Sequence, residues 1–123
     1  MRTGGQQVPS YFENRDRWWA APVECYSAFA RLRREKVLTR AQEDQARALV
    51  ARLTAAWTEI EPSREVRDRA GRVLLLHPLR AADSLHLAAA LVWTGGSTEG
   101  HHFVCLDERL REAARSEGFL VMP

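Results

Sequence analysis

Three acidic residues, Glu24, Asp83 and Asp107, occupy positions from which they could bind a ligand. Asp107 follows the apolar run 103–106 and precedes a helical pattern, and open α/β sheets bind ligands at the carboxyl ends of their strands. An ordinary N-cap is the alternative role of Asp107, since Asp is common there. Asp83 and Glu24 each fall in the first turn of a predicted helix, where a carboxylate complements the helix dipole. Each residue alone therefore has a structural explanation beside the functional one.

A strand–helix–strand unit is predicted at the C-terminal end of the sequence. Residues 103–106 form a short apolar run typical of a strand buried on both faces. A helix over 108–117 follows, with Leu110, Ala113 and Ala114 inward, and Gly118 suits its C′ position. Residues 119–122 form the second strand, so we expect an α/β fold with a short parallel sheet flanked by helices.

Four helices are predicted before this unit. The first covers 22–36 and begins with a proline. Thr39 and Gln42 have the capping-box spacing and open the second helix. The third starts at Pro62 and Ser63 and stops at Pro78, and the fourth covers about 80–93. Apolar spacing places these residues inward in the first three helices: Val23, Tyr26, Phe29, Ala30; Ala46, Leu49, Val50, Leu53, Trp57; Val66, Ala70, Val73, Leu74.

Residues 1–17 show little periodic spacing of apolar residues. Residues 1–17 form an irregular segment with several helix and strand breakers, and 18–123 form a single domain. The segment 17–21, which contains Trp18 and Trp19, is predicted as a short strand that meets Pro22.

Length and composition exclude several classes of protein. The chain has 123 residues, 46% of them hydrophobic and 28% charged, which excludes a disordered tail, a collagen-like fibre and a disulfide-stapled mini-protein. The longest stretch without Asp, Glu, Lys or Arg is 84–98, too short to span a bilayer, and no secretion signal opens the chain. Two cysteines make no disulfide framework, so we expect a cytoplasmic protein with no membrane partner. The net charge of +2 is too small to indicate nucleic-acid binding by itself.

Considered jointly, four motifs resemble a known family. Their sequences are PVECYSA at 22–28, LRAADSLHLA at 79–88, FVCLDERL at 103–110 and GFLV at 118–121. Together they resemble the PIN domain, and most closely the VapC-type toxin ribonucleases of bacterial toxin–antitoxin pairs. The resemblance covers about 18–123.

The resemblance implies a PIN-like fold and a divalent-metal-dependent endoribonuclease. In such domains scattered acidic side chains form one pocket that holds Mg²⁺ or Mn²⁺, and carboxylates suit these hard cations. It implies that Glu24, Asp83 and Asp107 are metal ligands, with an RNA substrate, a cognate antitoxin protein and a homodimer as partners. The metal would lower the pKa of a bound water and stabilise charge on the leaving oxygen.

One part of the family pattern has no counterpart in this sequence. The family begins with an apolar strand that ends in an Asp ligand, and nothing before Trp18 matches it; Glu13 and Asp16 lie in a polar stretch. We therefore expect the N-terminal strand to be missing, which would expose a sheet edge. A catalytically inactive PIN remnant that binds an antitoxin or dimerises is the alternative function.

The remaining candidates favour structural roles. His101, His102 and Cys105 lack a second ligand pair at a zinc-finger spacing. His86 lies between two leucines and is interpreted as a packed or hydrogen-bonded helix residue rather than a ligand. The four tryptophans could stack on bases, but packing in the core or at an interface is the preferred interpretation.

Overall fold

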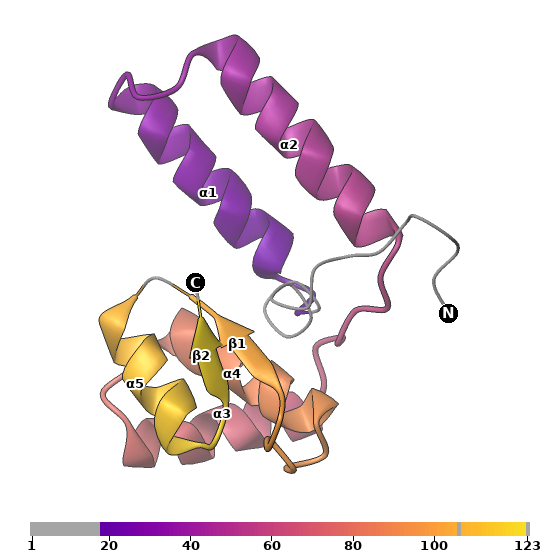
Figure 1. Ribbon diagram of the computed structural model, residues 1–123, viewed down its shortest axis with the longest axis vertical. Coiled ribbons are helices and arrows are strands. Elements are labelled where there is room, and N and C mark those ends of the chain that lie inside the picture. Colours follow the sequence, from indigo (N-terminus) through magenta and orange to yellow (C-terminus); the bar gives the residue numbers. More distant parts are fainter. Residues whose placement is uncertain (1–17, 106, 123) are drawn as a thin grey trace.

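The computed structural model describes residues 18–105 and 107–122. Its five helices and two strands occur in the order α1 (Ala21–Arg34), α2 (Arg40–Ala55), α3 (Arg64–Leu76), α4 (Ala81–Trp93), β1 (His102–Val104), α5 (Glu108–Ser116) and β2 (Leu120–Met122). Helices α1 and α2 form a hairpin that stands apart from a body made of α3, α4, α5 and the strands (Figure 1). The fold is a helix-rich α/β arrangement, which agrees with the predicted α/β class.

Helix α4 is the centre of the body. It is apolar on nearly every side, and most of its residues between Ser84 and Leu91 are buried. Because a helix that is hydrophobic all round must be covered all round, it lies between two apolar clusters. One cluster joins it to α3 and to the chain before α1, and the other joins it to β1, α5 and the start of β2.

The sheet has two strands within the part of the chain that the structure describes. Strands β1 and β2 are parallel, with His102 opposite Leu120 and Val104 opposite Met122. Helix α5 connects them, so the predicted strand–helix–strand unit is confirmed. Both strands are shorter than predicted, and Leu106 of the predicted run 103–106 lies outside the described residues. Phe103 and Cys105 are buried on one face of this run, whereas Val104 on the opposite face is half-buried, so the expected burial of both faces is confirmed for one face only.

The helix boundaries follow local capping chemistry. The Thr39 hydroxyl accepts from the Gln42 backbone N–H, and the Gln42 side chain accepts from the Thr39 backbone N–H, which confirms the capping box. Ser63 caps α3 by accepting from the Val66 N–H. The inward residues predicted for α5 are all buried, and so are those of α3 except Leu74, which is exposed because α3 packs against α4 along one side only.

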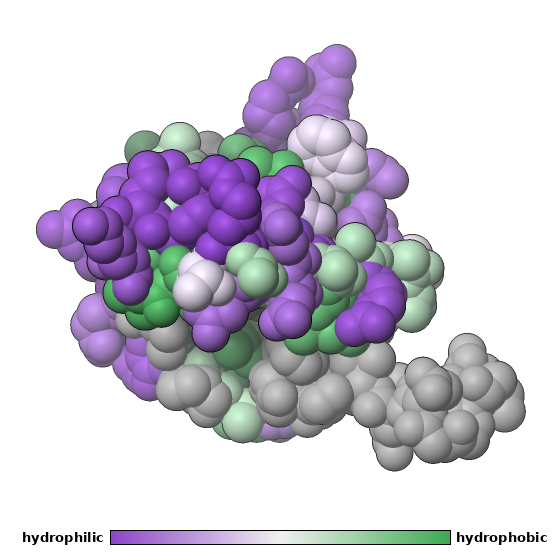
Figure 2. Space-filling view, turned by 90° about the horizontal axis from the view of Figure 1, so that it is seen from above, coloured by the Kyte–Doolittle hydropathy of each residue, from purple (hydrophilic) through white to green (hydrophobic). Residues whose placement is uncertain are grey.

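The α1–α2 hairpin has little buried apolar surface of its own. Among its residues only Ala21 and Glu43 are buried, and Glu43 forms an ion pair with Arg33 across the hairpin. Val23 and Leu49 are 64% and 49% exposed, so the prediction that they face inward is wrong. The end of the hairpin viewed in Figure 2 is mostly hydrophilic, with hydrophobic residues in separate patches.

The strand predicted at 17–21 is wrong over 18–21, and Arg17 lies outside the described residues. Trp18 makes a single parallel bridge with Ile60, and the Trp19 N–H donates to the Ile60 carbonyl at 3.0 Å. The Ala21 N–H then donates to the Trp18 carbonyl at 2.9 Å, which closes a turn and starts α1. Extended conformation therefore ends after one bridge.

In the described residues, no helix is both long and apolar enough to cross a bilayer.

Candidate functional site

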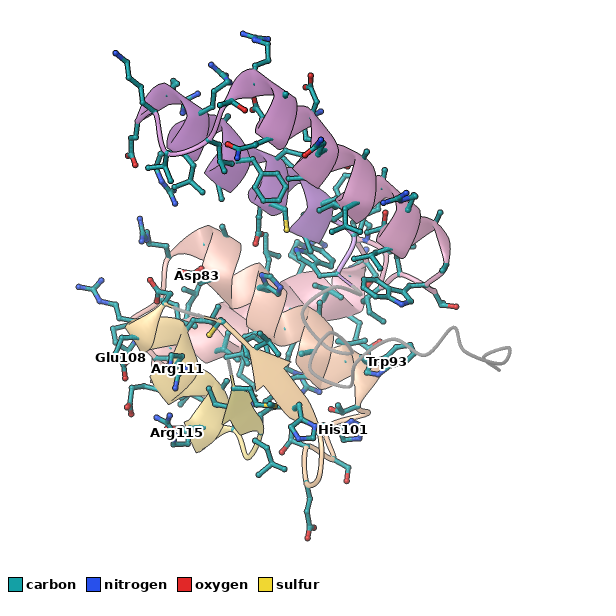
Figure 3. All side chains as sticks on the ribbon, turned by 45° about the horizontal axis from the view of Figure 1, so that its top comes forward. Asp83, Trp93, His101, Glu108, Arg111 and Arg115 are labelled. Atoms are coloured by element: carbon teal, nitrogen blue, oxygen red, sulfur yellow. The ribbon has the colours of Figure 1, made fainter. Side chains whose placement is uncertain are left out.

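The three predicted site residues lie at the starts of three different helices. Glu24 is in the first turn of α1, Asp83 is in the first turn of α4, and Asp107 is the N-cap of α5, just after β1. In Figure 3, Asp83 lies on the side of the molecule where α5 begins at Glu108, whereas Trp93 and His101 lie on the opposite side. The fold thus brings the starts of α4 and α5 to one side of the body.

The Asp83 carboxyl group interacts electrostatically with each of the other two acids. Burial raises the pKa of Asp83 above its usual value of 3.8, and the charges of Asp107 and Glu24 raise it further. Arg80 and His86 oppose this rise by lowering the pKa of the same carboxyl. Asp83 therefore interacts with two acids that are distant in the sequence, Glu24 at 59 positions before it and Asp107 at 24 positions after it.

Glu24 is held by a buried histidine. The Nδ1 atom of His86 lies 2.9 Å from Glu24 Oε1, at the distance of a hydrogen bond that the carboxylate accepts. His86 is buried on α4, and its ring meets Phe103 edge-on with 6.0 Å between the centroids. The interpretation of His86 as a packed, hydrogen-bonded residue is confirmed, and its partner is one of the candidate site residues.

Asp107 uses its two oxygens differently. Its Oδ1 atom accepts from the Leu110 backbone N–H at 3.0 Å, so the N-cap role is confirmed. Its Oδ2 atom lies 3.9 Å from Nη2 of Arg80. The capping role therefore occupies one oxygen and leaves the other facing the guanidinium of Arg80.

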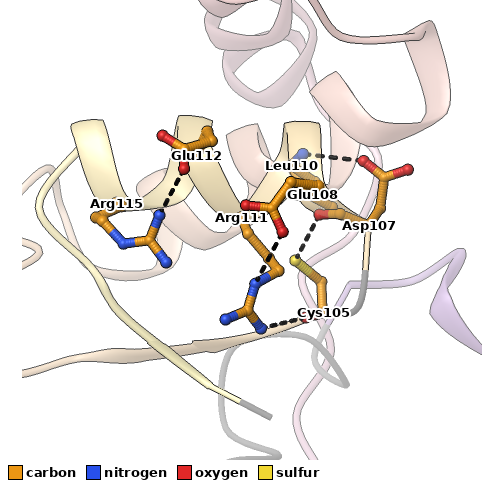
Figure 4. Close-up of polar contacts among 7 residues, drawn as sticks. All are labelled: Cys105, Asp107, Glu108, Leu110, Arg111, Glu112 and Arg115. Atoms are coloured by element: carbon orange, nitrogen blue, oxygen red, sulfur yellow. Dashed lines mark hydrogen bonds and ion pairs between the residues drawn. The ribbon is translucent and has the colours of Figure 1, made fainter.

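The link between β1 and α5 is fixed by further polar contacts (Figure 4). Arg111 donates from Nη1 to the Cys105 carbonyl at 3.1 Å, and its Nε atom lies 3.8 Å from Glu108 Oε2. The Cys105 thiol donates to the Asp107 carbonyl at 3.7 Å. These contacts hold the backbone on both sides of Asp107. Neither Cys105 nor Cys25 forms a disulfide.

Sequence reasoning missed Arg80 and Arg111. Arg80 lies three positions before Asp83, a spacing that places both around the first turn of α4. Arg111 lies four positions after Asp107, which is one helical turn along α5. These spacings were available in the sequence, but the partners across the fold were not.

A divalent metal is the group that the resemblance implies, and the donors can be compared with it. Among the described residues, no three His, Cys, Asp or Glu side chains come together as a group that could hold a metal ion, His101, His102 and Cys105 included. Mg²⁺ usually keeps several waters and is held by one or two carboxylates. Carboxylate oxygens suit a hydrated hard cation, but within the described residues Glu24, Asp83 and Asp107 do not form a three-ligand group for one.

The tryptophans have different environments. Trp18 is buried in the core between α3 and α4, whereas Trp19 is 51% exposed. Both line an apolar pocket of about 600 Å³ together with the start of α3 and Leu85 of α4. Trp57 is half-buried and Trp93 is exposed, so packing accounts fully for Trp18 alone.

Comparison of the chain with protein-family models, with curated proteins and with solved structures gives no match. The functional interpretation therefore depends on the residues and on the geometry described above.

Proposed function

We propose that this protein is a divalent-metal-dependent endoribonuclease with a PIN-like fold, of the kind found as the toxin of a toxin–antitoxin pair. The observation that supports this function is that both Asp107 and Glu24 raise the pKa of Asp83, and that the three residues come from the starts of three helices. Neighbouring negative charges raise the pKa of a carboxyl group, and a bound cation would offset this effect. A hydrated Mg²⁺ or Mn²⁺ is the cation that matches oxygen donors of this kind.

In this proposal each residue of the site has a defined task. Burial and the charges of Asp107 and Glu24 raise the pKa of Asp83, so a bound cation would favour its ionised form. His86 fixes the Glu24 carboxylate, and the α5 cap fixes Asp107, so both are oriented before any ion arrives. A bound metal would activate a water and stabilise charge on the scissile phosphodiester.

The test is RNA cleavage that depends on the metal. The full chain is incubated with a mixed RNA pool in Mg²⁺ or Mn²⁺, with and without EDTA, and the products are separated by gel. We expect EDTA-sensitive cleavage that Asp83→Asn abolishes. Asp68→Asn, on the exposed side of α3, is the matched control and should leave cleavage unchanged. Cleavage that persists in EDTA, or in the Asp83 variant, would contradict the proposal.

A catalytically inactive module is the second candidate, and two observations favour it. The described residues contain no ready-made group of three metal ligands. The α1–α2 hairpin exposes apolar side chains such as Val23, Val37 and Leu49, which a partner would cover. In this case the chain would bind an antitoxin protein or form a homodimer without cleaving RNA. Light scattering and the cleavage assay together separate the two: a dimer with no metal-dependent cleavage supports the inactive module.

The proposed cellular location is the cytoplasm. It is supported by Cys25 and Cys105, which form no disulfide, because structural disulfides are the rule in oxidising compartments. An RNA substrate would be met in the same compartment.

A further inference from the structure

The connection between α1 and α2 is strongly basic. Residues 31–40 contain five basic side chains and one acidic side chain, whereas the whole chain has a net charge of only +2. In Figure 1 this connection lies at the end of the hairpin away from the body. Positive charge is therefore concentrated at one projecting end of the molecule.

Four of the five basic side chains have no structural partner. Arg33 is the exception, because it forms the ion pair with Glu43 across the hairpin. The other four are exposed, and within the described part of the chain none of their side chains forms an ion pair or a hydrogen bond. We call them the hairpin-tip cations: Arg31, Arg34, Lys36 and Arg40.

Lys36 occupies a backbone position that favours glycine. Its φ is +64°, and among the described residues it is the one non-glycine residue with a positive φ. The Lys36 N–H donates to the Arg33 carbonyl at 3.0 Å. The Val37 N–H donates to the Leu32 carbonyl at 2.8 Å, which completes a Schellman motif, and the residue at this position of the motif is usually glycine. A lysine side chain is therefore present where glycine would suit the backbone better.

Arg40 is also placed against the local helix electrostatics. It is the first residue of α2, and the start of a helix favours acidic side chains. Arg31 and Arg34 differ from it, because they lie in the last turn of α1, where the helix dipole favours basic side chains. Helix chemistry thus explains two of the hairpin-tip cations but not Lys36 or Arg40.

We propose that the hairpin-tip cations bind the phosphate backbone of RNA. Clustered exposed basic residues are the electrostatic signature of a surface that binds nucleic acid, and a guanidinium can donate two parallel hydrogen bonds to one phosphate. The choice of RNA as the polyanion rests on the proposed function. The binding itself needs no metal ion and none of the three candidate site carboxylates.

The apolar content of the tip favours RNA over a lipid surface. A helix that lies in a membrane interface needs an apolar face that enters the acyl chains. Within residues 31–40, Val37 is the one large apolar residue that is exposed. This end of the hairpin is mostly hydrophilic in Figure 2. Electrostatic binding to a phosphate backbone requires no such apolar face.

RNA binding is tested in EDTA, so that the result does not depend on a metal site. A short fluorescein-labelled single-stranded RNA of mixed sequence is titrated with the full chain, and fluorescence anisotropy gives Kd at several NaCl concentrations. The tip variant carries Arg34→Gln, Lys36→Gln and Arg40→Gln. The matched control variant loses three exposed arginines outside the tip: Arg52→Gln, Arg64→Gln and Arg72→Gln. Thermal unfolding checks that both variants retain the fold.

The tip variant should lose both affinity and salt dependence. We expect it to bind RNA roughly tenfold more weakly at low salt, and the slope of log Kd against log salt should fall by about two, at about 0.7 for each phosphate contact of a single strand. The control variant should keep the wild-type slope, since it removes the same charge away from the tip.

Lys36→Gly separates the role of the side chain from that of the backbone. Glycine adopts a φ of +64° without steric cost, so this variant should melt at the wild-type temperature or above it. Its RNA binding should nevertheless weaken, with a salt slope smaller by about 0.7. Wild-type RNA affinity in Lys36→Gly would remove Lys36 from the surface that we propose.

The remaining outcomes are equally decisive. No RNA binding by the wild type in EDTA, or equal losses in the tip and control variants, would overturn the inference. Tighter binding of phosphatidylserine vesicles or of polyglutamate than of RNA would overturn the choice of partner. RNA binding that depends on the tip, in a chain that shows no metal-dependent cleavage, would support the inference while the proposed nuclease fails.

Discussion

His86 Nδ1 and Glu24 Oε1 lie 2.9 Å apart and connect α4 of the body to α1 of the hairpin, across 62 positions of sequence. The histidine is buried and the glutamate is half-buried, so the contact is shielded from water on one side. It also determines where one candidate metal ligand is placed. Stability and site geometry should therefore respond together to changes at Glu24.

We expect Glu24→Ala to lower the free energy of unfolding by about 1–3 kcal/mol, because a buried polar group loses a charged partner. Glu24→Gln should cost less, since its amide oxygen still accepts from Nδ1–H. Urea unfolding measures both, and Glu35→Ala at the exposed end of α1 is the control. Equal unfolding free energies for Glu24→Ala and the wild type would show that the contact contributes nothing.

Substitutions of Asp107 should separate its capping role from metal binding. Asn is as good an N-cap as Asp, so Asp107→Asn should unfold at nearly the wild-type urea concentration, while Asp107→Ala should lose about 0.5–2 kcal/mol. Both variants should bind Mn²⁺ more weakly, because each removes a carboxylate. Unchanged Mn²⁺ affinity in Asp107→Asn would leave the residue as a cap only.

The raised pKa of Asp83 predicts a pH-dependent stability of the metal-free protein. The folded state holds the Asp83 proton to a higher pH than the unfolded state does, so stability falls as pH rises from the unfolded pKa, near 3.8, through the folded one. Above that window the ionised carboxyl destabilises the fold. In EDTA at neutral pH, Asp83→Asn should therefore melt at a higher temperature than the wild type, and this difference should vanish below pH 3.8. A lower melting temperature for the variant at neutral pH would reverse the sign.

Gly118 should tolerate no side chain. Its φ of +101° favours glycine, and a Cβ atom there would lie 2.3 Å from the Thr98 hydroxyl, which donates to the Glu117 carbonyl at 2.6 Å. We expect Gly118→Ala to cost about 2 kcal/mol or more. Gly71 in α3 has open space around it, so Gly71→Ala should instead stabilise the protein by about 0.5–1 kcal/mol. Thermal unfolding of the two variants gives shifts of opposite sign if both expectations hold.

Features that depend on residues close together in the chain, such as the helix caps, were predicted correctly from the sequence. Thr39, Ser63 and Asp107 cap helices because side chain and backbone lie within three residues of one another, and the parallel sheet follows from element order. Burial in the hairpin was mispredicted because an apolar stripe such as that of Leu49 shows which face is suited to burial, not whether anything covers it. The same limit applies to the site: Asp83 was found from its position, but its electrostatic interaction with Asp107 and Glu24 depends on tertiary placement.

The sparse burial in the α1–α2 hairpin has a consequence for local unfolding. Segments with few buried apolar contacts open at lower free energy than the core, so amides of α1 and α2 should exchange with solvent before those of α4. Glu24 lies in α1, which we expect to open first, whereas Asp83 lies in α4, which we expect to open later. One carboxylate would therefore leave the other two during partial opening, and the lifetime of the complete acidic group would be set by the hairpin rather than by global unfolding.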